Sequence, residues 1–129
     1  MTKQFGLLLS LTCVFLSCEE ILEVQDISEQ EVQLLSPTSG SVVTDTIVNF
    51  NWDPVNAANA YHIQIATPNF QNAAQFVLDS TLVVDSTFVG TRISRTLSSA
   101  AYEWRVRAQN SDFETAFFVN DFTVDTSSD

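Results

Sequence analysis

Lysine is almost missing from this chain, and basic residues of either kind are few. Five residues are Lys or Arg and 16 are Asp or Glu, which gives a net charge of −11 at pH 7. A surface with this charge repels phosphate backbones and anionic lipid headgroups. The composition therefore argues against nucleic-acid binding and against electrostatic attachment to a membrane.

Histidine, cysteine and glycine are also scarce, and this disfavours several kinds of chemical site. One histidine and two cysteines are too few for the three or four clustered ligands of a zinc site. Three glycines cannot supply a glycine-rich phosphate loop. The histidine, His62, has no nucleophile near it in the sequence, so no catalytic pair is predicted. We expect no catalytic residues, no metal, no cofactor other than covalent lipid, and no enzymatic activity.

Long apolar runs are absent except at the N-terminus. Residues 5–16 are mostly apolar and follow a basic start that contains Lys3. About twelve residues is the length of the apolar part of a secretory signal, and it is too short to span ~30 Å of hydrocarbon. Residues 1–17 are therefore predicted to be a signal peptide.

The residues around Cys18 resemble the lipobox of bacterial lipoproteins. Small Ser17 precedes the cysteine, although Phe15 stands where leucine is usual. Cys13 is a rival, but Thr12 before it fits the pattern poorly. The resemblance implies removal of the signal and lipidation of Cys18, with an ordinary secretory signal as the alternative. Each buried CH₂ of a lipid contributes ~0.8 kcal/mol, so several acyl chains would anchor the protein firmly.

Residues 18–31 are predicted to form an acidic tether. Glu19 and Glu20 follow Cys18 directly, and the stretch EEILEVQDISEQE contains no Gly or Pro. Acidic residues at this place resemble the surface-export signal of lipoproteins from the Bacteroidota. The resemblance implies an outer-membrane location on the cell surface, with the periplasmic face as the alternative. Without residues 1–17, Cys18 is the only cysteine, which excludes a disulfide inside the domain.

Residues 32–125 are predicted to form an all-β domain, followed by a polar tail at 126–129. Apolar and polar residues alternate with a period of two, which indicates half-buried strands. Tyr61 and Ile63, for example, alternate with His62 and Gln64. The predicted strands are 32–36, 45–52, 60–66, 74–79, 81–89, 92–97, 101–109 and 115–125. The predicted core is Phe50, Trp52, Tyr61, Ile63, Trp104, Val106 and Phe122. A change of phase in the last strand predicts a bulge near Asn120.

Two stretches resemble a fibronectin type III domain, which is immunoglobulin-like. TIVNFNWDPVNAANAYHIQI (46–65) resembles its strands B and C, with Trp52 late in strand B and Tyr61 in strand C. Leu97 and Tyr102 resemble its E–F corner, where the tyrosine side chain ties the corner to nearby backbone. The spacing is one residue short, and the usual proline is absent. The resemblance covers about 32–125 and implies a two-sheet sandwich of seven to eight antiparallel strands, a fold that hosts many roles.

A candidate binding surface follows from placing strands 60–66 and 101–109 side by side, as in that fold. Their outward residues then lie together, and arginine forks can bind carboxylates or sugar hydroxyls. Aromatic residues in predicted loops could stack on a sugar ring. The alternative is a solvated face of paired charges. The candidate residues are His62, Gln64, Arg105 and Arg107, with Glu103 beside them, and Phe70 and Phe113 in loops.

The predicted function is that of a non-enzymatic outer-membrane lipoprotein with one β-sandwich domain. Its role would be binding, adhesion or that of an accessory subunit of a surface complex, with a protein or a glycan as partner. The alternative is a glycan-binding lipoprotein of a polysaccharide-utilisation system. The plan is similar to that of starch-utilisation accessory lipoproteins, although their further sugar-binding domains are not in this chain.

Overall fold

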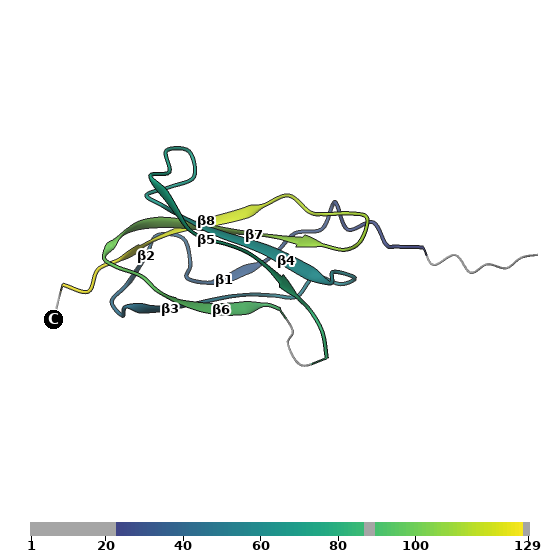
Figure 1. Cartoon of the computed structure of the whole chain (residues 1–129), viewed down its shortest axis with the longest axis horizontal. Coiled ribbons are helices and arrows are strands. Elements are labelled where there is room, and N and C mark those ends of the chain that lie inside the picture. Colours follow the sequence, from purple (N-terminus) through teal and green to yellow (C-terminus); the bar gives the residue numbers. More distant parts are fainter. Residues whose placement is uncertain (1–22, 87–89, 128–129) are drawn as a thin grey trace, which may run out of the picture.

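The chain folds into two packed β-sheets (Figure 1). The computed structural model describes residues 23–86 and 90–127. The strands are β1 (Leu34–Ser36), β2 (Ser41–Val43), β3 (Ile47–Trp52), β4 (Ala60–Thr67), β5 (Gln75–Val83), β6 (Arg92–Thr96), β7 (Ala100–Gln109) and β8 (Phe118–Val124). One sheet has the order β1-β3-β6 and the other the order β2-β8-β7-β4-β5. The predicted two-sheet sandwich is confirmed.

Strand β2 is a correction to the predicted layout. It was not expected, and it runs parallel to β8, whereas the other pairs in the described sheets are antiparallel. A short turn precedes it, in which Gly40 has φ +80° and the amide of Ser41 donates to Thr38 O at 3.1 Å. A strand of three residues is too short for its alternation to be recognised in the sequence.

Two further predictions about strands are wrong. The stretches 74–79 and 81–89 were expected as two strands, but Gln75–Val83 is one strand that pairs with β4 along its length; residues 87–89 lie outside the described residues. The bulge near Asn120 is also absent, because β7 and β8 keep an unbroken register from Ala100 to Val106. Phe118 takes the inward position before Asn120, which leaves Val119 on the outer face and 45% exposed.

The core lies between the sheets and is built around large aromatic side chains. The ring of Phe50 on β3 meets that of Trp104 on β7 at 5.1 Å, and the ring of Trp52 meets that of Tyr61 at 5.8 Å, both edge to face. Trp104 also donates from Nε1 to Pro37 O at 3.1 Å, which satisfies its buried polar group. The seven residues predicted for the core are all buried.

The N-terminal segment takes part in this packing. Ile27, which falls in the predicted tether, is fully buried and belongs to the core cluster. Asn110 Nδ2 donates to Gln25 O at 2.9 Å and so ties the same segment to the loop after β7. The packed unit therefore begins before residue 32. Among the described residues there is no helix, and hence none long and apolar enough to cross a membrane.

Replacing Trp104 with alanine is expected to lower the free energy of unfolding by about 3–5 kcal/mol, because the change leaves a large cavity between the sheets. Chemical denaturation measures this loss. The matched control is Val119→Ala on the outer face of β8, which should change stability by less than about 0.5 kcal/mol. Equal losses in the two variants would contradict the assigned core.

Candidate binding face

The outer face of the five-stranded sheet gathers most of the residues predicted as a binding surface. β4 pairs with β7 so that His62 lies opposite Arg107 and Gln64 opposite Arg105. The residues between them, Ile63, Ile65, Trp104 and Val106, have no exposed surface and fix which side of each strand faces outward. We call this surface the Arg–Phe face and define it by His62, Gln64, Phe70, Arg105, Arg107 and Phe117.

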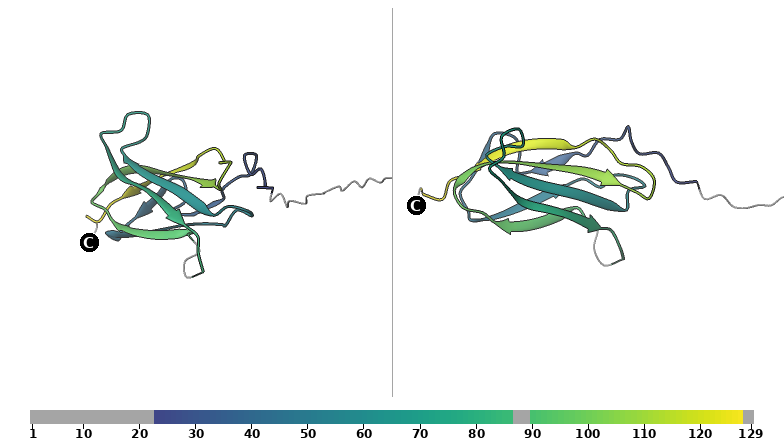
Figure 2. Two further views of the ribbon diagram at one scale, coloured as in Figure 1. Left: turned by 45° about the vertical axis from the view of Figure 1, so that its right-hand side comes forward. Right: turned by 45° about the horizontal axis from the view of Figure 1, so that its top comes forward.

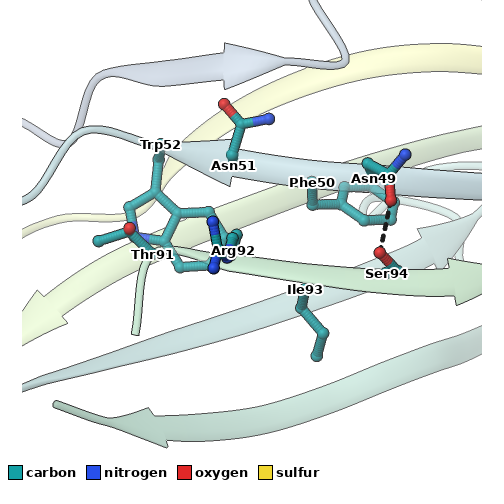
Figure 3. Close-up of a pocket in the computed structure, with 8 residues that line it drawn as sticks. All are labelled: Asn49, Phe50, Asn51, Trp52, Thr91, Arg92, Ile93 and Ser94. Atoms are coloured by element: carbon teal, nitrogen blue, oxygen red, sulfur yellow. Dashed lines mark hydrogen bonds between the residues drawn. The ribbon is translucent and has the colours of Figure 1, made fainter. Parts of the chain in front are cut away.

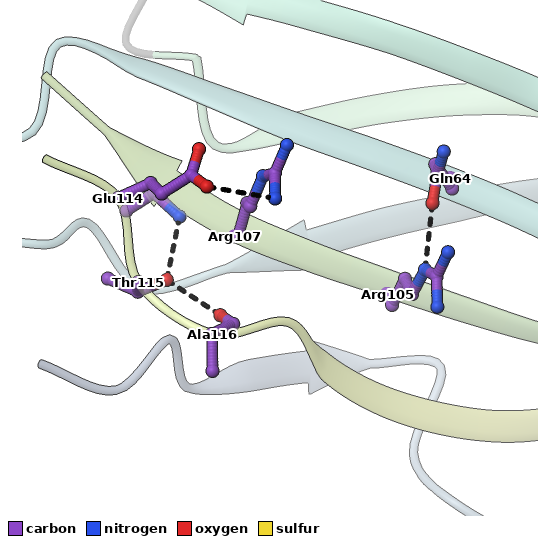
Figure 4. A network of polar contacts seen from close by, with 7 residues as sticks. Gln64, Arg105, Arg107, Glu114, Thr115 and Ala116 are labelled. Atoms are coloured by element: carbon purple, nitrogen blue, oxygen red, sulfur yellow. Dashed lines mark hydrogen bonds and ion pairs between the residues drawn. The ribbon is translucent and has the colours of Figure 1, made fainter. Parts of the chain in front are cut away.

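Arg105 occupies the middle of the Arg–Phe face. Its guanidinium carbon lies 4.0 Å from the centroid of the Phe70 ring and 4.4 Å from that of Phe117. Its Nε donates to Gln64 Oε1 at 2.8 Å (Figure 4). Contacts of this kind between a cation and a ring contribute about 0.5–2 kcal/mol each. They hold the guanidinium in one orientation above the sheet.

The terminal nitrogens of Arg105 remain available to a ligand. Within residues 23–86 and 90–127, the ion pairs are His62–Asp79 and Arg107–Glu114, and Arg105 belongs to neither. Its side chain makes one hydrogen bond there, through Nε. Burial lowers the pKa of Arg105 and the neighbouring Arg107 adds to the effect, whereas the charges of Asp79 and Glu103 raise it; the guanidinium stays charged at neutral pH.

The loop after β4 brings Phe70 over Arg105. The backbone amide of Phe70 donates to Glu103 Oε1 at 2.9 Å, and Thr67 Oγ1 donates to Ala101 O at 2.6 Å. Both acceptors belong to β7, so the loop is attached to the strand that carries Arg105. The Phe70 ring also meets the edge of Phe76, 5.5 Å away, which is 43% exposed and extends the aromatic surface.

The segment before β8 places Phe117 on the opposite flank. Buried Thr115 accepts from the amide of Ala108 at 3.1 Å and donates to Ala116 O at 2.7 Å, which fixes this segment against β7 (Figure 4). The guanidinium of Arg107 lies 4.6 Å from the Phe117 ring. Its ion pair with Glu114 is long at 3.3 Å, and its buried Nε has no hydrogen-bond partner among residues 23–86 and 90–127. Arg107 therefore has a donor that this part of the chain leaves unused.

His62 is more constrained than an exposed strand histidine. Its Nε2 lies 2.6 Å from Asp79 Oδ1 on β5, and its side chain is 18% exposed. The ring also packs beside Phe117 at 5.5 Å. The hydrogen bond from His62 is the main reason that the pKa of Asp79 lies below its ordinary value of 3.8. The Asp79 carboxylate therefore borders the Arg–Phe face on the side of β5.

Comparison with known proteins supports the fold. No family model matches this chain, and no curated protein matches it either. Among solved structures, FN3tt has a TM-score of 0.50 at 14% identity, over 74% of this chain and 97% of that one. CopC from Methylosinus trichosporium OB3b gives 0.48 at 15% identity (77% and 98% covered), and an Fn3-like protein from Clostridium thermocellum gives 0.42 at 16% (67% and 84%).

The fold is a fibronectin type III-like β-sandwich. Its expected tyrosine corner is present, because Tyr102 Oη donates to Ser98 O at 2.7 Å. Trp52 ends β3 and Tyr61 lies at the start of β4, as strands B and C of the family predict. A likeness at this level of identity describes the fold and carries no information about a ligand.

On this type III-like sandwich, one predicted site residue lies elsewhere and one contributor was missed. Phe113 was expected as an exposed loop aromatic, but it is partly buried and packs against the core, because its amide donates to Asn110 Oδ1 at 2.9 Å and holds the loop inward. Phe117 was not among the predicted binding residues, although the change of phase in the last strand sets it apart from the core aromatics. Its spacing of two residues from Val119, on the outer face of β8, was the available indication that it joins Arg105.

The other sheet of the type III-like domain carries a separate groove (Figure 3). It has a volume of about 590 Å³ and runs along β3 and β6. Side-chain amides and hydroxyls line much of it, and Ser94 Oγ donates to Asn49 Oδ1 across it. The buried Nε1 of Trp52 beside it has no hydrogen-bond partner in the described part of the chain. Arg92 lines this groove, but within the described residues its guanidinium makes no hydrogen bond or ring contact like those that hold Arg105.

Proposed function

We propose that this protein is a non-enzymatic binding module, anchored to the outer membrane by lipid on Cys18 and facing the cell surface. The observation that carries the binding role is Arg105, which is held by Gln64 and two phenyl rings while its terminal nitrogens have no partner in the part of the chain that the structure describes. A side chain that is fixed before binding loses little conformational entropy when a ligand arrives. The role is that of an adhesion domain or an accessory subunit of a surface complex.

The arrangement of the chain suits an anchored module. Figures 1 and 2 show the first described residues at one end of the sandwich and the C-terminus at the other. Cys18 lies outside the described residues. The nine steps from Cys18 to buried Ile27 span at most ~30 Å when extended, so a lipid there would hold the domain close to the membrane. The loop that carries Phe70 lies toward the end away from this segment (Figures 1 and 2).

A second candidate is a glycan-binding lipoprotein of a polysaccharide-utilisation system. The observation that favours it is the row formed by exposed Phe76, the Phe70 ring and Arg105 on an open strand surface. Aromatic rings with a few polar groups are the usual composition of a small-ligand site. This candidate shares the lipid anchor and the Arg–Phe face with the first and differs only in naming a glycan as the ligand.

Mass spectrometry of the protein extracted from native cells in detergent tests the anchor. We expect the mass of a chain that starts at Cys18 and carries acyl groups. Cys18→Ser is expected to leave the precursor unprocessed, whereas the matched control Cys13→Ser should be lipidated like the wild type. An unmodified chain that starts elsewhere would contradict the proposal.

Photo-crosslinking on living cells tests the binding face. A benzophenone amino acid at Val119, which is 45% exposed and lies opposite Arg105 on β8, should form an adduct with the partner. The control position is Ile47, which is 52% exposed on the outer face of the other sheet. The adduct at Val119 should disappear in an Arg105→Glu background. Failure to form an adduct at Val119, or equal adducts at both positions, would refute the assigned face.

A further inference from the structure

We infer that the Arg–Phe face binds a carbohydrate that carries a single carboxylate, such as a uronic or sialic acid within an otherwise neutral glycan. This inference rests on the proposed function, because it names the ligand of the face proposed there. Three features of the face carry it: the orientation of Arg105, the aromatic rings beside it, and the acidic residues around it.

The orientation of Arg105 determines the ionic group of the ligand. The hydrogen bond from Nε to Gln64 occupies the inner edge of the guanidinium. The two terminal nitrogens remain, and together they match the two oxygens of a carboxylate in a bidentate pair. A lysine could not reproduce this geometry, because its ammonium is a point charge. Arg107, with one long ion pair to Glu114, is a second donor nearby.

The aromatic rings determine the rest of the ligand. Phe70 and Phe117 contact the guanidinium of Arg105, and Phe76 continues the row with 43% of its surface exposed. A sugar ring has C–H groups on its faces and can lie against such phenyl rings. A carboxylate attached to that sugar can then reach Arg105. A sugar acid has both parts in one compact unit.

The surrounding charge argues against a polyacidic peptide. Asp79 and Glu114 border the face in their pairs with His62 and Arg107, and Glu103 lies two residues from Arg105 on β7. The whole chain has a net charge of −11, with five basic residues against 16 acidic ones. A ligand with many negative charges would be repelled within the ~8–10 Å over which charges act at physiological salt. A glycan with one carboxylate among neutral sugars can pair with Arg105 and is repelled much less by these acidic residues.

Titration followed by NMR tests the inference with matched probes. The acidic probes are glucuronosyl-xylotriose and sialyllactose, the neutral ones are xylotriose and lactose, and a tetraglutamate peptide represents the polyacidic alternative. We expect at least one acidic sugar to bind, with shifts at Gln64, Phe70 and Arg105, and its neutral counterpart to bind at least about tenfold more weakly.

Variants of the full chain test whether the acidic sugar binds through the guanidinium of Arg105. Arg105→Lys keeps the charge and should still weaken binding of the acidic sugar about tenfold, because the fork is lost. Arg92→Gln, on β6 of the other sheet, removes a charge elsewhere and should leave the affinity within about twofold. A thermal melt confirms that each variant is folded.

Three results would overturn the inference: no shift with either acidic sugar, equal affinity for acidic and neutral sugars, or preferential binding of tetraglutamate. Its failure is distinguishable from that of the proposed function. An adduct at Val119 that depends on Arg105, combined with no binding of acidic sugars, would keep the binding face and reject this ligand. No adduct at Val119 would reject the face itself.

Discussion

The packing of Trp104 against Phe50 and Trp52 is the contact on which the rest of the molecule depends. Phe50 and Trp52 belong to β3 and Trp104 to β7 of the other sheet. The Trp104 ring lies 5.1 Å from that of Phe50 and 6.1 Å from that of Trp52, so the three hold the two layers together without a disulfide. Because side chains alternate along a strand, burying Trp104 and Val106 forces Arg105 and Arg107 to the outer face. The core therefore determines the position of the candidate site as well as the stability of the domain.

Arg105 shows how a charged side chain can be kept in place on a strongly acidic domain. Two phenyl rings and one amide hold it. No carboxylate of the described residues forms an ion pair with it, although the charges of Asp79 and Glu103 act on it from nearby. Covering a guanidinium costs solvation, which lowers the pKa of Arg105 through burial. A purely solvated face would be expected to pair the arginine with an acid, as Arg107 pairs with Glu114. The unpaired cation is the reason to regard this face as a binding surface.

Alternation along long strands made much of this arrangement predictable. The pattern at 60–66 and 101–109 placed His62, Gln64, Arg105 and Arg107 on one face, and the structure brings them together. Contacts set by loops were not predictable, because no periodicity governs them. Thr115 and Glu103, which position Phe117 and Phe70, act through individual hydrogen bonds that leave no pattern in the sequence. The same holds for Ile27, one of a few apolar residues in an acidic stretch, which is buried by long-range packing.

The most direct test of this account is an NMR measurement of the arginine Nε–H groups in the ligand-free protein. The account predicts a separate, slowly exchanging signal for Arg105, shifted by the ring currents of Phe70 and Phe117, because Nε donates to Gln64 beside two rings. Exposed Arg92 and Arg95 are internal references and should exchange rapidly at ordinary shifts. If the Arg105 signal coincides with theirs, the guanidinium is not held in place, and the basis for the binding face is removed.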